Sequence, residues 1–350
     1  LSILQIGDSH IQAGFFPNEV RENLQREFGN AGRGLIVPLK LAGTNEPPDY
    51  AITSPNSWNR SNCITRAATE EPGMSGMSIV TYDRHIELDI KTKEPFDRIW
   101  AFHHREAPLL TVPDSLSDGI CCRARDNDEM TLIPLSRPVE QIRLCASVAD
   151  SSFAHSAFYG FSLENGRSGV LYHSFGINGN TYAAIIRNPQ IVRQASGLCP
   201  DLVIVSLGTN DSYGASFDPA DADVQITRLI DSIRRNMPAS VLLLTTPMEH
   251  CRRIRSKGRT YRKPNPNACA MRECILRQAA LYRLPVWDFY AAAGGDGAMG
   301  RWADLGIANA DRVHLSREGY RLQGKLFYDA IMKAYDHYRK HNGELKILLN

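Results

Sequence analysis

The 350-residue sequence has no apolar run that approaches the roughly 20 residues needed to cross a bilayer. Its longest apolar stretches, at 202–207 and 241–244, have the length of buried strands. The sequence also lacks an excess of charge, since a net charge of +2 does not support nucleic-acid binding. No internal repeat or low-complexity tract is visible, which excludes solenoid and fibrous architectures. We therefore expect no transmembrane segment and no nucleic-acid partner.

Metal and cofactor signatures are missing as well. The eight cysteines include no Cys-x-x-Cys pair, and the ten histidines show no metal-ligand spacing. The glycine-rich stretch 294–297 lacks the Gly-Lys-Ser/Thr and the following helix of a phosphate-binding loop. We therefore expect no metal and no cofactor.

What is present is the composition of a globular protein, with 43% apolar and 22% charged residues. A length of 350 residues suits two domains, or one domain with a large insertion. The chain begins at Leu1, not Met, inside a strand-like run, which suggests that an upstream segment such as a signal peptide has been removed. We therefore expect an exported protein of the periplasm or cell envelope.

Strands and helices alternate at both ends of the chain. Apolar runs of strand type occur at 3–6, 170–175, 202–207, 241–245 and 286–289. Periodicity and capping residues predict helices at 17–28, 181–194, 219–236, 268–282 and 317–340. This alternation predicts an α/β fold, a flavodoxin-like three-layer α/β/α domain whose parallel sheet has the order 2-1-3-4-5.

The stretch from about 36 to 165 interrupts this alternation. It opens with a Pro/Asn/Ser-rich segment at 44–62 without helical periodicity, and short strand-type runs follow at 78–82, 85–90, 98–103, 130–135, 141–147 and 157–163. Asn165-Gly166 is a hairpin signal that joins the last of these runs to the strand at 170. We interpret the stretch as an inserted β-sandwich, so that residues 1–35 and 170–350 form one domain and residues 36–169 another.

The first turn with chemical potential is Gly7-Asp8-Ser9-His10, directly after the first strand and before a helix. Parallel α/β sheets place their ligands at the carboxyl ends of the strands, and a helix N-terminus there favours developing negative charge. This position makes Ser9 a candidate nucleophile. The alternative is an ordinary Gly-Asp-Ser turn.

A second candidate, Asp311-Arg312-Val313-His314, lies just before the last helix. A carboxylate three residues ahead of an imidazole can accept its Nδ1 proton, which leaves Nε2 free to take a proton from a serine hydroxyl. Taken alone, this motif favours the alternative, a capped loop that carries a solvent-facing histidine.

Two further turns follow strands of the predicted sheet. Gly208-Thr209-Asn210-Asp211 ends the strand at 202–207, which is a neighbour of the first strand in the order 2-1-3-4-5. Asn210 would then emerge beside Ser9, where its amide can donate to an oxyanion. Gly179, in Gly176-Ile177-Asn178-Gly179-Asn180-Thr181, permits a close backbone approach and offers a second N–H donor. Each turn alone is also a common loop.

The four turns occur in the order Ser, Gly, Asn, Asp-x-x-His, and this order resembles the blocks of the SGNH (GDSL-like) hydrolase family. The resemblance covers residues 1 to about 35 and 170 to 350. It departs from the usual pattern at His10, where Leu is commoner, and at Asn180, where Asp is usual. It implies a serine esterase with Ser9, Asp311 and His314 as catalytic triad, and with Gly179, Asn210 and the Ser9 amide as oxyanion hole.

About 170 residues separate Ser9 from Gly179, because the β-rich stretch falls between them. Gly-Asp-Ser-His, an insertion at this point and a Gly-Ile-Asn-Gly second block together resemble the bacterial peptidoglycan O-acetylesterases, whose insertion is similar to a carbohydrate-binding module. The resemblance implies an O-acetylated polysaccharide as substrate and an acyl-enzyme intermediate. Two alternatives stay open: a lipid or thioester acylhydrolase on the same scaffold, and a carbohydrate-binding envelope protein that is not catalytic.

Other residues are secondary candidates. Asp8 and His10 flank Ser9, and Trp302 shortly precedes the Asp-x-x-His motif, so all three are possible substrate contacts. The segment 252–263 holds seven basic residues on the predicted active-site rim. It is a solvated loop or, in a sharper interpretation, a basic flap that meets an anionic polymer such as one with peptidoglycan stem carboxylates. Trp58, Tyr82, Trp100 and Phe102 are aromatic candidates for sugar stacking in the insertion, or members of its core.

Overall fold

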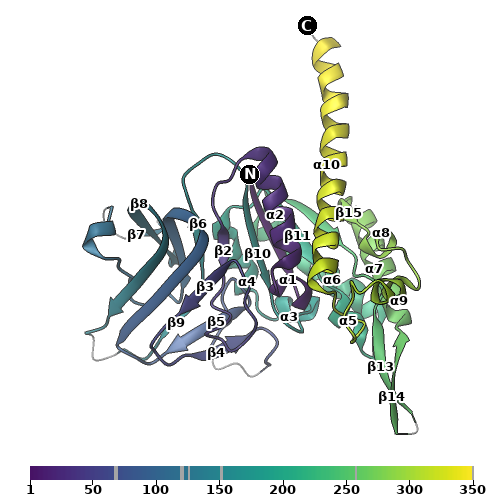
Figure 1. The fold of residues 1–350 in the computed structure, drawn as a ribbon, viewed down its shortest axis with the longest axis horizontal. Helices are drawn as coiled ribbons and strands as arrows, with labels where there is room; N and C mark the ends of the chain where they lie inside the picture. Colours follow the sequence, from purple (N-terminus) through teal and green to yellow (C-terminus); the bar gives the residue numbers. More distant parts are fainter. Residues whose placement is uncertain (67–69, 119–121, 125–126, 150–152, 257, 349–350) are drawn as a thin grey trace.

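The computed structural model describes residues 1–66, 70–118, 122–124, 127–149, 153–256 and 258–348 (Figure 1). Its central element is a five-stranded parallel sheet in the order β10-β1-β11-β12-β15. Counted along the chain, the strands of this sheet therefore lie in the order 2-1-3-4-5. Their bounds are β1 Ser2–Gly7, β10 Leu171–Gly176, β11 Leu202–Ser206, β12 Val241–Thr245 and β15 Val286–Trp287.

Each face of this sheet is covered by its own hydrophobic cluster. Alternate residues of β1 point to opposite faces, with Leu4 and Ile6 in one cluster and Ile3 in the other. The helices of the first cluster are α3 Tyr182–Ile186, α4 Gln190–Ala195, α6 Pro219–Asn236 and α7 Pro266–Tyr282. Those of the second are α2 Phe15–Phe28, α8 Phe289–Ala292, α9 Ala298–Asp304 and α10 Arg317–Leu348. Helix, sheet and helix thus form three layers.

The helix predicted at 181–194 is wrong as a single element. The chain forms α3 and α4 instead, separated by Asn188 and Pro189, because the proline has no N–H to continue the hydrogen-bond ladder. The predicted helix at 219–236 and the strand at 241–245 are confirmed to the residue. The last helix is longer than predicted and projects beyond the body of the protein (Figure 1).

Most strands of the interrupting stretch form one connected, antiparallel sheet of eight strands. Its members are β2 Gly34–Ile36, β3 Tyr50–Thr53, β4 Asn59–Asn62, β5 Met77–Thr81, β6 His85–His103, β7 Cys122–Ala124, β8 Asn127–Ser147 and β9 Ser156–Glu164. The strands β5 and β9 are buried on both faces, except for Glu164 at the end of β9. Since these strands belong to a single hydrogen-bonded network, their description as a β-sandwich stays a prediction.

Several predicted boundaries in this stretch are wrong. The runs at 85–90 and 98–103 are one long strand, β6, which continues through register shifts between Lys91 and Arg98. The runs at 130–135 and 141–147 likewise belong to one strand, β8, and the predicted loop at 44–62 contains β3 and β4. Asn165-Gly166 does not close a hairpin, because β9 and β10 belong to different sheets. The turn that this signal predicted connects the two sheets instead.

The two sheets share one hydrophobic core. A continuous cluster joins β-rich residues such as Ile79 and Phe158 to Val205 and Leu244 of the parallel sheet. The sequence predicts one domain of residues 1–35 and 170–350 and a second domain of residues 36–169. Because the two sheets share this core, that division stays a prediction. Among the described helices, none is both long and apolar enough to span a membrane.

Buried ion pairs also hold the two parts together. Arg21 of α2 and Arg33 donate to the carboxylate of Asp49, at 3.1 and 2.7 Å, and all three side chains are buried. Asp49 immediately precedes β3 of the antiparallel sheet. Burial alone would raise the pKa of Asp49, but the Arg33 and Arg21 guanidinium groups hold it well below its usual range. The ionised carboxylate is therefore the counter-charge of two buried arginines.

Replacement of Asp49 by Asn should destabilise the protein by about 3 to 5 kcal/mol, because it leaves the two arginines buried without a counter-charge. Since the folded-state pKa of Asp49 is depressed, its contribution is present above the ordinary aspartate pKa of about 3.9 and is lost as the pH falls below it. Urea unfolding at several pH values measures both effects. The control is Asp89→Asn at the exposed Asp89–Arg143 pair, which should cost less than about 1 kcal/mol. Equal costs would contradict this assignment.

Candidate active site

Ser9 lies at the carboxyl end of β1, as the first residue of the short helix α1 Ser9–Gln12. The Asp8 carboxylate caps this helix by accepting a hydrogen bond from the His10 N–H at 3.0 Å. The turn packs so closely that a Cβ on Gly7 would lie 2.1 Å from Ile11 Cγ1. A residue larger than glycine is excluded at this position, and the close packing fixes the direction of Ser9.

The loop before α10 brings His314 to Ser9. The Ser9 Oγ and His314 Nε2 atoms are 2.9 Å apart, and His314 Nδ1 lies 2.7 Å from Asp311 Oδ2. The other carboxylate oxygen, Asp311 Oδ1, accepts the backbone N–H groups of Val313 and His314. Between them, Arg312 has a left-handed φ of 54°, which is uncommon outside glycine and closes the loop tightly.

This arrangement sets the tautomer of the His314 imidazole. Burial raises the pKa of Asp311, but the hydrogen bonds from the His314 ring and from the two backbone groups lower it more, so its pKa lies below the usual value. The ionised carboxylate accepts the Nδ1 proton of His314. Nε2 is then free to take the Ser9 hydroxyl proton, as general-base activation of a serine requires.

Gly179 and Asn210 line the same open pocket as Ser9 and His314, which has a volume of about 520 Å³. The parallel pairing of the strands explains why Gly179 and Asn210 lie near Ser9. Strand β1 lies between β10 and β11, and Gly7 is in register with both Gly176 and Ser206. A Cβ on Gly179, at φ +84°, would have no atom within 4 Å, so this backbone is open to the pocket. Asn210 Nδ2 donates to Asn180 O at 3.0 Å and to Asp8 Oδ2 at 3.3 Å.

Three residues that sequence reasoning missed hold the Gly179 turn. The amide of Gln12 is buried and donates to Asn45 Oδ1 at 2.8 Å, while its carbonyl accepts the Asn178 N–H at 2.8 Å. Asn178 Nδ2 also donates to Asn45 Oδ1, at 3.1 Å. Asn45 and Asn178 both line the pocket, so a residue that precedes β3 contributes to its wall. No motif in the sequence marks such a long-range amide network.

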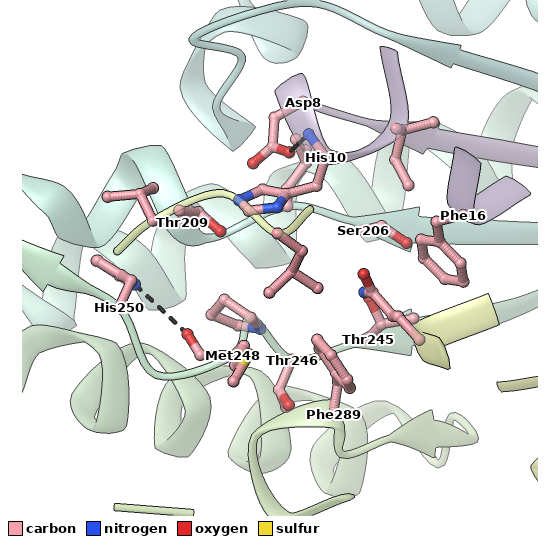
Figure 2. A pocket seen from close by; sticks show the side chains of 16 residues that line it. Asp8, His10, Phe16, Ser206, Thr209, Thr245, Thr246, Met248, His250 and Phe289 are labelled. Carbon is pink, nitrogen blue, oxygen red and sulfur yellow. Dashed lines mark hydrogen bonds between the residues drawn. The ribbon is translucent and has the colours of Figure 1, made fainter. Parts of the chain in front are cut away.

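Asp8 and His10 lie behind Ser9 and not in its pocket. They line a separate cavity of about 30 Å³, and Figure 2 shows the His10 ring directed into it. Burial, followed by the charges of His314 and His250, lowers the pKa of His10 to about 3, so this ring is neutral near pH 7. The ring stacks on His314 with centroids 5.1 Å apart, and its Nδ1 is 3.0 Å from the Tyr320 hydroxyl. His10 thus packs against the back of the His314 imidazole.

Asp8 is almost completely buried beside Asn210. Burial raises the pKa of its carboxyl to about 7, although the His10 N–H bond and the nearby His314 act in the opposite direction. Trp302, the third secondary candidate, is buried against Phe289, and its indole N–H donates to Ala293 O. It is absent from the lining of the Ser9 pocket. The structure therefore brings the triad and the oxyanion candidates together, but none of these three into the pocket.

Comparison with known proteins agrees with this geometry. Residues 151–322 match the model of the GDSL-like Lipase/Acylhydrolase family. The matched range contains Gly179, Asn210 and His314, whereas Ser9 lies before the inserted strands and outside it. No curated protein sequence matches the chain.

One solved structure extends the likeness to most of the chain. A peptidoglycan O-acetylesterase aligns with a TM-score of 0.76 at 20% identity, over 95% of this chain and 91% of its own. A lipase/acylhydrolase from Enterococcus faecalis aligns over 47% of this chain and 76% of its own, at 22% identity and TM-score 0.37. An acetyl xylan esterase covers 46% and 81%, at 18% identity and TM-score 0.37. At these identities, the first alignment shows a shared fold that includes the inserted strands.

Ser9 should react selectively with a fluorophosphonate, since phosphorus is attacked by an activated serine oxygen and fluoride leaves. Mass spectrometry of the labelled protein should locate the adduct on Ser9. His314→Ala should slow labelling by at least about 10³-fold, because it removes the base. Ser316→Ala is the matched control, since Ser316 lines the same pocket as Ser9 and His314. An adduct on Ser316 would contradict the assignment.

Proposed function

We propose that this chain, a member of the GDSL-like lipase/acylhydrolase family, is a serine esterase that removes O-acetyl groups from peptidoglycan or a related cell-wall polysaccharide. One observation carries the proposal: the Ser9 Oγ–His314 Nε2 contact of 2.9 Å, continued by the His314–Asp311 hydrogen bond, inside an open pocket. A serine hydroxyl in contact with an imidazole that a carboxylate orients has no use in a protein that only binds sugar. It therefore favours catalysis over the binding-protein alternative.

In the proposed reaction, His314 Nε2 accepts the Ser9 hydroxyl proton while Ser9 Oγ attacks the ester carbonyl carbon. The N–H groups of Ser9 and Gly179 and the Asn210 amide stabilise the tetrahedral oxyanion; a single such donor typically contributes a factor of about 10²–10³ to kcat. For Asn210, the 3.3 Å bond to Asp8 gives way to the oxyanion. Collapse expels the sugar hydroxyl, which takes the proton from His314, and water then hydrolyses the acyl-enzyme by the same path.

The lining of the pocket supports a sugar as substrate. Four asparagines contribute to it, Asn45, Asn178, Asn210 and Asn309, together with Ser316, beside the apolar residues Ala13, Phe15 and Leu315. Amides and hydroxyls suit the hydroxyl and N-acetyl groups of a glycan, whereas an acyl chain would need a continuous apolar wall. The solved peptidoglycan O-acetylesterase has the same fold over both parts of the chain, which supports this substrate class. Such a substrate also favours an exported protein of the cell envelope.

We also propose that residues 36–169, as the inserted domain, help to hold the polymer. Of the four aromatic candidates, Phe102 is in the core and Trp58 and Trp100 are partly buried against it, while Tyr82 is 61% exposed. Tyr82 lies 6.1 Å from the His155 ring. The exposed Tyr82 ring, beside the half-buried His155 ring, supports stacking on a sugar face.

Acetate release from O-acetylated peptidoglycan, compared with hydrolysis of p-nitrophenyl esters of increasing chain length, tests the function. We expect acetate release from the glycan and rates on the simple esters that fall as the acyl chain lengthens. Ser9→Ala should abolish both activities without changing thermal unfolding. A preference for long acyl chains would instead identify a lipid acylhydrolase, and a wild type inactive on every ester would leave a binding protein.

Tyr82→Ala tests the role of the inserted domain. Loss of the exposed ring should raise KM for the acetylated polymer several-fold, because one stacking contact is removed while the chemistry at Ser9 is not touched. Steady-state kinetics on the polymer measure the change. Tyr338→Ala is the matched control, since Tyr338 is 65% exposed on α10. An unchanged KM in the Tyr82 variant would contradict a role of the inserted domain in polymer binding.

A further inference from the structure

The basic segment beyond β12 is a two-stranded hairpin and not the predicted loop. Its strands, β13 Cys251–Ser256 and β14 Arg259–Pro264, pair only with each other among the described strands. Figure 1 shows the hairpin projecting away from the body, at the edge of the molecule near α5 (Thr209–Tyr213) and α9. The carboxyl ends of the parallel strands, and with them the Ser9 pocket, lie at that same edge.

The hairpin carries a local excess of positive charge. Residues 251–264 contain seven Lys or Arg and no Asp or Glu. The other 336 residues carry 33 basic and 38 acidic side chains, a net charge of −5, so the hairpin opposes the sign of the rest of the chain. The described cations of the hairpin are Arg252, Arg253, Arg255, Arg259, Arg262 and Lys263.

The pairing of the strands places like charges opposite each other. Arg252 faces Lys263 and Arg253 faces Arg262 across the ladder. Like charges in directly opposed positions destabilise an antiparallel pair. No ion pair between described residues includes any of the six cations. An isolated two-stranded hairpin is only marginally stable in water, so an anionic partner outside the chain would stabilise it by relieving this repulsion.

Both ends of the hairpin are anchored beside the catalytic loop. The Cys251 N–H donates to Arg312 O at 2.8 Å, and Arg312 lies between Asp311 and His314. At the other end, the Asn265 N–H donates to His250 O at 2.9 Å, and the buried Asn265 amide lies 3.1 Å from His250 Nε2. The hairpin therefore starts from a fixed position next to the triad.

We propose that this hairpin is a cationic arm that binds the carboxylates of an anionic glycan, the same polymer whose esters Ser9 cleaves; the inference rests on the proposed function. Guanidinium groups match carboxylates in a bidentate geometry. The described part of the arm has one aromatic residue, Tyr261, so it lacks the stacking platform of a single-stranded nucleic-acid site. Its apolar residues do not form the broad face of a membrane-surface element.

Binding to purified peptidoglycan sacculi, measured by co-sedimentation without turnover, tests the arm. The variant Arg253→Gln/Arg255→Gln should bind about five- to tenfold more weakly than the wild type at low ionic strength, because two exposed cations are lost. Added salt should weaken the wild type toward the variant. The charge-matched control is Arg228→Gln/Arg235→Gln on α6, which removes two exposed cations away from the site. Thermal unfolding of each variant shows that it is folded.

Chemical modification of the sacculi identifies the group that the cationic arm binds. Sacculi whose carboxylates are converted to amides should bind the wild type as weakly as unmodified sacculi bind the hairpin variant. If the amidated sacculi bind the wild type as tightly as unmodified ones, the arm binds wall phosphates and the carboxylate assignment is overturned. Equal losses in the hairpin and α6 variants, or tighter binding to anionic phospholipid vesicles or single-stranded DNA than to sacculi, would overturn the proposal. Since binding needs no catalysis, a wild type that binds sacculi through the arm but releases no acetate would refute the esterase function alone.

Discussion

The pairing of β1 with a parallel strand on each side is the constraint on which the rest of the site depends. Through it, the turns after β1, β10 and β11 emerge side by side, and these turns carry Ser9, Gly179 and Asn210. The packing at this edge is close: a Cβ on Gly176 would lie 2.3 Å from Asp8 O. Glycines therefore fix the backbone, and the chemistry of the site follows from the register of a sheet.

The inserted strands add a second support behind the same turns. The Cys63 thiol lies 3.5 Å from Asn180 Oδ1, and Asn45 joins Gln12 and Asn178. The Gly179 loop is thus held between the parallel sheet and the antiparallel sheet. In the proposed reaction, a tetrahedral oxyanion is stabilised only by donors that are already in place, so this double support would lower the energy of that intermediate.

Local patterns predicted much of this fold, and long-range contacts account for what they missed. The α/β alternation, the helix at 219–236 and the family resemblance are confirmed, because each depends on periodicity or short motifs. The merging of two predicted strands into β6 was missed, since Glu94-Pro95 reads as a break in sequence but is accommodated by register shifts in the sheet. The Gln12 network joins residues 33 and 166 positions apart, and no local pattern encodes such contacts.

The separation of Ser9 from His314 has a consequence for the timing of activity. Their contact spans 305 positions of the chain, so the proposed nucleophile is synthesised well before its proposed base. Synthesis runs from the N-terminus, and contacts between distant segments form only after the chain between them has collapsed. A nascent chain that has not yet reached His314 therefore holds the proposed nucleophile without its base. In the proposed enzyme, the order of the two residues in the gene keeps such a partial chain inactive.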